Sequence, residues 1–165
     1  MRVIFEHTIR VYSALEPISE MLTPAQFWDE LVEQLRHPMR YLEGLENVKI
    51  TESGEASQRL MLRTKDYGKF KVQETVSFVP HEQIKIAIKA SQQWPANQLT
   101  IRVQRPKSNG SVFLHFCYEE DSEPMSGQQA QMIAKFREQA YLAKDHDFVE
   151  HFREQILRKS PNPLN

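Results

Sequence analysis

Apolar and polar residues alternate along much of the first 120 residues, which predicts β-strands with one face turned to a core. In the first predicted strand, 2–13, Val3, Phe5, Ile9 and Val11 share one face with His7. Six further strands are predicted at 45–52, 56–64, 67–79, 83–91, 98–105 and 111–120. Short turns separate them at a spacing of ~8–12 residues, which favours an antiparallel meander.

Two short helices are predicted between the first strand and the second. Thr23 is a good N-cap, Pro24 takes the first helical position, and Gln26 completes a capping box. A second helix is predicted over 38–43 and ends at Gly44 as its C-cap.

The stretch 126–159 reads as one long helix, with Ser126 and Gln129 at the spacing of a capping box. At ~1.5 Å per residue it would be roughly 48 Å long. Its apolar residues recur at helical intervals and are Met132, Ile133, Phe136, Ala140, Ala143, Phe148, Phe152 and Ile156. The order β-α-α-β6-α predicts one α+β domain over 1–159, in which a curved seven-stranded antiparallel sheet wraps around the long helix, followed by a tail at 160–165.

Composition narrows the possible functions. The 165 residues suit one domain, and 21 basic against 22 acidic residues leave no basic excess for nucleic acid. Cys117 is the single cysteine, so no internal disulfide is possible and a reducing compartment is favoured. The sequence contains no apolar run of the ~20 residues that a membrane span needs, and its N-terminus turns polar early. A cytoplasmic protein without cofactor or metal is expected.

Three stretches carry a resemblance to a known superfamily: LTPAQFW at 22–28 with Pro38 and YLEGL at 41–45, QETVSFVP at 73–80, and AYLAKDHD at 140–147. With the order of elements, they resemble the START-type helix-grip superfamily (SRPBCC, Bet v 1-like), and within it the AtaL-like family of unknown function. The resemblance implies a cavity for lipids, sterols, polyketides or similar molecules. It also implies that the protein is either a cyclase or aromatase or only carries or senses its ligand. The glycine-rich loop of plant members has no counterpart, since the chain has five glycines.

Glu74 is the first candidate site residue, because it shares a strand face with Phe70, Val72, Val76 and Phe78. A carboxylate on that face must be protonated, paired or solvated. The expectation is a raised pKa, suited to a general acid/base or to anchoring a ligand. The alternatives are an internal pair with an arginine, or a bulge that turns Glu74 outward.

The other predicted lining residues come from the first strand and the long helix. His7 offers an imidazole to a ligand carbonyl or hydroxyl, or is satisfied within the core. Tyr141 offers a hydroxyl that donates and accepts, or is a core aromatic. The small residues Ala140 and Ala143 predict a void beside Tyr141. The predicted ligand-binding set is Glu74, His7, Tyr141, Phe70, Val72, Phe136 and Ala140.

The sequence gives less support for a cysteine nucleophile or for a metal site. His115 and Cys117 are placed on the outer face, without an orienting group for a nucleophile. The pairs His146–Glu150 and Asp147–His151 are solvated helix pairs rather than a metal site.

The residues around Trp94 form either a lid over the cavity or a plug at the end of the sheet.

Three functions remain open. The first is binding of a small hydrophobic ligand between sheet and helix. The second is a cyclase or dehydratase in which Glu74 or His7 moves a proton. The third is an interaction module with a filled core, whose outer face, bearing Ile4, Tyr12 and Phe113, contacts a partner or forms a homodimer.

Overall fold

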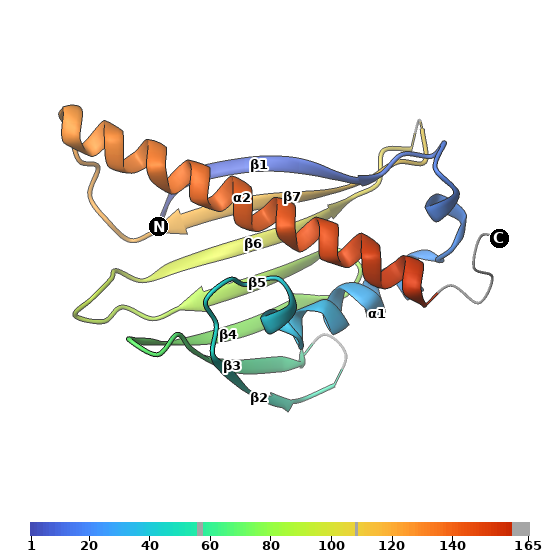
Figure 1. Ribbon diagram of the computed structural model, residues 1–165, viewed down its shortest axis with the longest axis horizontal. Helices are drawn as coiled ribbons and strands as arrows, with labels where there is room; N and C mark the ends of the chain where they lie inside the picture. Colours follow the sequence, from blue (N-terminus) through green and yellow to red (C-terminus); the bar gives the residue numbers. More distant parts are fainter. Residues whose placement is uncertain (56–57, 108, 160–165) are drawn as a thin grey trace.

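The computed structural model describes residues 1–55, 58–107 and 109–159. The predicted tail, 160–165, and the first two residues of the strand predicted at 56–64 lie outside this range. The strands form one seven-stranded sheet in the order β1-β7-β6-β5-β4-β3-β2 (Figure 1). Their bounds are Arg2–Tyr12 (β1), Asn47–Ser53 (β2), Leu60–Asp66 (β3), Lys71–Val79 (β4), Gln83–Ile88 (β5), Asn97–Gln104 (β6) and Val112–Glu120 (β7).

Every neighbouring pair of strands is antiparallel, so β2 to β7 form the predicted meander. The first strand pairs with the last, which places His7 opposite Phe116. The predicted helix-grip architecture is confirmed, with a curved sheet holding a long C-terminal helix. The register shifts between Arg10 and Tyr12, and Tyr12 is buried rather than on the outer face as predicted.

The first helix, α1 (Pro24–Leu35), has the predicted capping box. The Gln26 N–H donates to Thr23 Oγ1 at 3.2 Å, and the Thr23 N–H donates to Gln26 Oε1 at 2.9 Å. One short 3-10 turn, η1 (Pro17–Glu20), precedes α1 and was not predicted. The second predicted helix is wrong in extent, because only a 3-10 turn, η2 (Pro38–Arg40), forms there.

The long helix is α2 (Gln128–Arg158), whose 31 residues span roughly 46 Å. Its predicted capping box is wrong, because the N-cap is Gly127 and no side chain caps the helix. Gly127 has φ 101°, a conformation that suits glycine, and Ser126 therefore lies outside the helix. Among the described residues, no helix is long and apolar enough to cross a membrane.

Only the C-terminal half of α2 is packed in the core. Its buried residues are Asp145, Phe148, Val149, Phe152 and Ile156. The first turns of α2 extend past the ends of β1 and β7 in Figure 1. Accordingly, Met132 and Phe136 are 59% and 63% exposed. The predicted apolar stripe is therefore wrong for this half of the helix.

The main core lies where α1 and the end of α2 meet the sheet. The Phe27 and Phe152 rings pack edge to face at 5.1 Å, and both side chains are fully buried. Because this core fills one end of the sheet, the space under the middle of α2 is left for a cavity.

Candidate ligand-binding site

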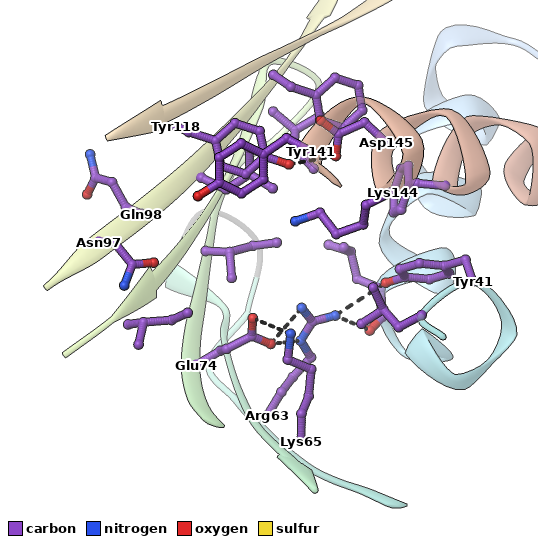
Figure 2. Close-up of a pocket in the computed structure, with 18 residues that line it drawn as sticks. Tyr41, Arg63, Lys65, Glu74, Asn97, Gln98, Tyr118, Tyr141, Lys144 and Asp145 are labelled. Atoms are coloured by element: carbon purple, nitrogen blue, oxygen red, sulfur yellow. Dashed lines mark hydrogen bonds and ion pairs between the residues drawn. The ribbon is translucent and has the colours of Figure 1, made fainter. Parts of the chain in front are cut away.

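A cavity of about 210 Å³ lies between strands β3 to β7, the middle of α2 and the turn after η2 (Figure 2). It lies between the sheet and the long helix, where the sequence predicted a ligand site, and Tyr141 is one of its walls. Its walls are Leu35, Tyr41, Leu42, Arg63, Lys65, Glu74, Ile86, Ile88, Asn97, Gln98, Leu99, Ile101, Phe116, Tyr118, Tyr141, Lys144, Asp145 and Phe148.

The cavity has a closed floor and an accessible rim. Ile101 and Phe116 are almost completely buried and form an apolar floor. Leu42, Asn97 and Leu99 are half-buried, so they mark the side facing solvent. The cavity therefore opens between the start of β6 and the turn that carries Leu42.

An ion cluster of Glu74, Arg63 and Lys65 occupies one wall. The Glu74 Oε1 atom accepts from Arg63 Nε at 3.0 Å and lies 2.7 Å from Arg63 Nη2, while its Oε2 atom lies 2.9 Å from Lys65 Nζ. Arg63 also donates to the Leu35 carbonyl at 2.9 Å and to the Tyr41 hydroxyl at 3.4 Å. Alternation along β3 and β4 places all three charged side chains on the inner face.

The ion cluster determines the ionisation of Glu74. Burial raises the pKa of the Glu74 carboxyl, but the charges of Arg63 and Lys65 outweigh it, so the pKa is lowered. The predicted raised pKa is therefore wrong, and the alternative of an internal pair with an arginine describes the geometry. The inward orientation of Glu74 is confirmed, since it is 5% exposed.

A second polar group joins β1, β7 and α2 through Asp145. The Tyr118 hydroxyl donates to Asp145 Oδ1 at 2.7 Å, and His7 Nε2 lies 2.7 Å from Asp145 Oδ2. Burial raises the pKa of the Asp145 carboxyl more than Lys144 and these hydrogen bonds lower it. The Tyr118 hydroxyl keeps its proton and donates a hydrogen bond to Asp145, because burial and the nearby Asp145 raise the pKa of Tyr118 far above the usual range of tyrosine.

Two further side chains of α2 face the cavity. The Tyr141 ring stacks on the Tyr118 ring at 3.8 Å, and its hydroxyl accepts from Arg137 Nη2 at 3.1 Å. Lys144 extends its amine into the open part of the cavity in Figure 2. Burial lowers the pKa of the Lys144 amine.

Of the seven predicted ligand-binding residues, the structure brings Glu74 and Tyr141 to the cavity. His7 faces inward but lies behind Asp145, which separates it from the cavity wall. Val72 is buried on the same strand face as Glu74, without lining the cavity.

The remaining three predicted residues point elsewhere. Phe70 is 43% exposed and packs between Tyr67 and Trp94. Phe136 and Ala140 are exposed. The buried face of α2 follows the spacing of 145, 148, 152 and 156, with Tyr141 one turn earlier, and at ~100° per residue this turns Ala140 and Ala143 away.

Sequence reasoning missed Arg63, Lys65, Tyr118, Lys144 and Asp145. Two of these had a usable signal. Tyr118 alternates with Leu114 and Phe116 on the inner face of β7, and Asp145 lies three residues before the buried Phe148. Arg63 and Lys65 had no such signal, because charged residues on a strand usually face water.

The outer-face pair is not an activated nucleophile. Burial raises the pKa of the Cys117 thiol, and the charges of Glu119 and Glu6 raise it further. His115 Nε2 lies 3.5 Å from Glu6 Oε2. Trp94 is half-buried and packs edge to face on Phe70 at 6.2 Å, away from this cavity.

The comparison with protein families gives a match over most of the chain. The family described as AtaL, acetylaranotin biosynthesis cluster protein L, matches residues 9–158. The chain belongs to the AtaL family. This family match spans both α2 and the strands that line the cavity. No curated protein matches the sequence.

Solved structures similar to this AtaL-family chain share its fold at low sequence identity. The di-domain ARO/CYC StfQ from the steffimycin biosynthetic pathway has a TM-score of 0.63 at 11% identity, over 93% of this chain and 51% of StfQ. The chain thus spans about half of StfQ. Protein of unknown function SA2116 from Staphylococcus aureus has a TM-score of 0.58 at 11% identity, over 94% of this chain and 96% of SA2116.

A third structure is the Zhui aromatase/cyclase from Streptomyces sp. R1128, with a TM-score of 0.57 at 13% identity, over 94% of this chain and 95% of Zhui. At these identities the likeness shows the Bet v 1-like helix-grip fold, and the chemistry must be argued from the cavity itself.

Proposed function

We propose that this protein binds a small, largely apolar molecule in the cavity between the sheet and α2. The observation that carries the proposal is an interior space whose apolar floor, which includes Ile101 and Phe116, faces a wall of polar and charged side chains. Ligand sites commonly combine apolar walls with a small number of placed polar groups. Such groups orient a ligand, while the apolar walls supply most of the favourable transfer free energy.

The cavity size sets the kind of ligand. Its volume of about 210 Å³ is below the ~300–1,000 Å³ of typical ligand pockets. It therefore holds a compact molecule, or the inner end of a longer one whose remainder passes the rim at Leu42 and Leu99. A cavity of this size also argues against the filled-core interaction module considered above.

Proton transfer by Glu74 or His7 is less well supported. Glu74 has a lowered pKa and already accepts from two cationic side chains, so it is a weak base at neutral pH. His7 does not reach the cavity wall. Two structural neighbours, StfQ and Zhui, are named as aromatase/cyclases, which is the reason to consider an enzyme. The geometry of Glu74 and His7 gives little support for proton transfer by either residue.

The proposal is tested by blocking the rim. Leu99→Trp adds an indole beside the half-buried entrance, whereas Val79→Trp adds the same group at a position that is 42% exposed and outside the cavity wall. Calorimetric titration with straight-chain and phenyl-substituted alcohols of four to ten carbons is expected to show binding to wild type. We expect Leu99→Trp to weaken it at least tenfold, with Val79→Trp unchanged. An absence of binding, or equal affinity in both variants, would contradict the proposal.

A further inference from the structure

Lys144 is the charged side chain of the cavity wall that makes no ion pair or hydrogen bond among the described residues. The two carboxylates of the cavity wall are engaged elsewhere: Glu74 with Arg63 and Lys65, and Asp145 with Tyr118 and His7. The Lys144 Nζ atom instead lies over aromatic rings, 4.9 Å from the centroid of Tyr118 and 5.5 Å from that of Tyr141. Cation–π contacts of this kind stabilise an ammonium only partly.

Charge along the cavity wall is unbalanced. Arg63, Lys65 and Lys144 are cationic, and they face two carboxylates, Glu74 and Asp145. The three cations line one continuous space, and with all five groups ionised the wall carries one positive charge in excess. Burying an ammonium without a counter-ion is unfavourable, which is why burial lowers the pKa of Lys144.

The position of the amine also suits a ligand. Lys144 lies on α2 three residues after Tyr141, so both side chains project from one face of the helix into the cavity. In Figure 2 its amine points away from the helix, towards the space between Tyr118 and the ion cluster. Apolar side chains of Ile86, Ile101 and Phe116 line the remainder of that space.

We infer that the ligand of this cavity carries a carboxylate, which pairs with the Lys144 ammonium while its apolar part packs on the isoleucine and phenylalanine walls. This inference rests on the proposed function and specifies its ligand class. The ligand supplies the counter-charge that the protein lacks, and a hydrogen bond to a charged partner is stronger than one between neutral groups. The two cations of the ion cluster differ from Lys144, because each already contacts an oxygen of Glu74, Arg63 at 2.7 Å and Lys65 at 2.9 Å.

The test compares matched ligands that differ only in charge. Carboxylates of four to ten carbons, straight-chain and phenyl-substituted, are titrated at pH 7 beside the alcohols of the same carbon skeleton. In wild type we expect at least one carboxylate to bind about tenfold tighter than its alcohol, the equivalent of ~1.4 kcal/mol. In Lys144→Met that preference should disappear while alcohol binding persists. Lys135→Met removes an exposed lysine of the same helix and should retain the preference.

The outcomes separate the two proposals. Alcohols that bind as tightly as their carboxylates, or a preference that survives Lys144→Met, overturn the inference and leave cavity binding intact. Binding of neither series contradicts both.

A second measurement needs no variant. Acetylation of wild type by acetic anhydride, followed by mass spectrometry, should be slowed at Lys144 by the best carboxylate and much less by its alcohol at equal occupancy. Equal protection by both would overturn the inference.

Discussion

Substituting Glu74 by glutamine is expected to leave two buried cations without their shared counter-charge. Glu74 is 5% exposed, Arg63 3% and Lys65 9%, so bulk water has little access to the groups that lose their interactions. Glutamine keeps an acceptor oxygen for Arg63 but turns an amide NH₂ group towards the Lys65 ammonium. The change therefore removes the negative charge and places a donor against a donor.

The size of the effect follows from burial. Removing one partner of a buried ion pair typically destabilises a protein by ~3–5 kcal/mol. A domain of this size is commonly stable by about 5–15 kcal/mol, so the variant should fold but be much weaker. An exposed pair provides the contrast: Lys159 and Glu30 lie 3.1 Å apart with side chains 51% and 20% exposed, and Glu30→Gln should change stability by ~0–1 kcal/mol.

Urea denaturation at pH 7, followed by circular dichroism, measures both free energies of unfolding. The pH dependence gives a second test. Because the folded-state pKa of Glu74 is lowered from 4.5, its stabilisation is complete above that value and is lost as the pH falls through the folded-state pKa. Glu74→Gln should lack this loss. A destabilisation below 1 kcal/mol at pH 7, equal to that of Glu30→Gln, would refute the reasoning.

Three other variants test separate parts of the account by the same unfolding assay. Tyr118→Phe removes the donor to Asp145 Oδ1, while the His7 contact at Oδ2 remains, and should destabilise by ~1.5–3 kcal/mol; an effect within error would contradict the hydrogen bond. Thr23→Ala should lower stability by ~1 kcal/mol through loss of the capping box, and Thr23→Ser should largely preserve it. Lys144→Met should be more stable than wild type at pH 7. Because the folded-state pKa of Lys144 is lowered, the wild-type protein gains stability as the pH rises towards the unfolded-state pKa of lysine. The difference in free energy of unfolding between Lys144→Met and wild type should therefore narrow between pH 7 and 10. A difference that stays constant would contradict a desolvated amine.

The sheet was predictable because alternation and turn residues agree along the chain. The face of β4 shows this: Val72, Glu74, Val76 and Phe78 share the predicted inward parity and are all buried. The cap of α1 was predictable for a similar reason, since Thr23 and Gln26 form it with neighbours in sequence. Local patterns of this kind do not depend on where distant elements pack.

The face of α2 could not be predicted from apolar residues alone. Its N-terminal half carries Met132, Ile133 and Phe136 at helical spacing, but these side chains are 59%, 47% and 63% exposed. The buried face at the cavity instead contains Tyr141 and Asp145, which an apolar pattern does not select. The available signal was Asp145, a polar residue that shares a helix face with the buried Phe148.

The ion cluster depends on the pairing of β3 with β4. Arg63 lies opposite Glu74 only because of the register that joins the two strands, and a shift of one residue would turn one partner to the other face. From the sequence, a buried carboxylate at Glu74 was expected to need a partner. Only the strand register shows that the partners are Arg63 and Lys65. Lys144 could not be predicted for the same reason. That it forms no ion pair follows from the partners of Glu74 and Asp145, which only the tertiary structure shows.

The central claim is that the cavity beneath the middle of α2 takes up a small apolar ligand. Isoleucine δ1-methyl NMR tests it most directly, because Ile86, Ile88 and Ile101 line the cavity, whereas Ile4 and Ile133 line a separate groove under the start of α2. With octanoate and octanol added in turn, we predict concentration-dependent shifts at the three cavity methyls, and larger ones at equal concentration for octanoate. Shifts confined to Ile4 and Ile133, or no saturable shift at the cavity methyls, would contradict the claim.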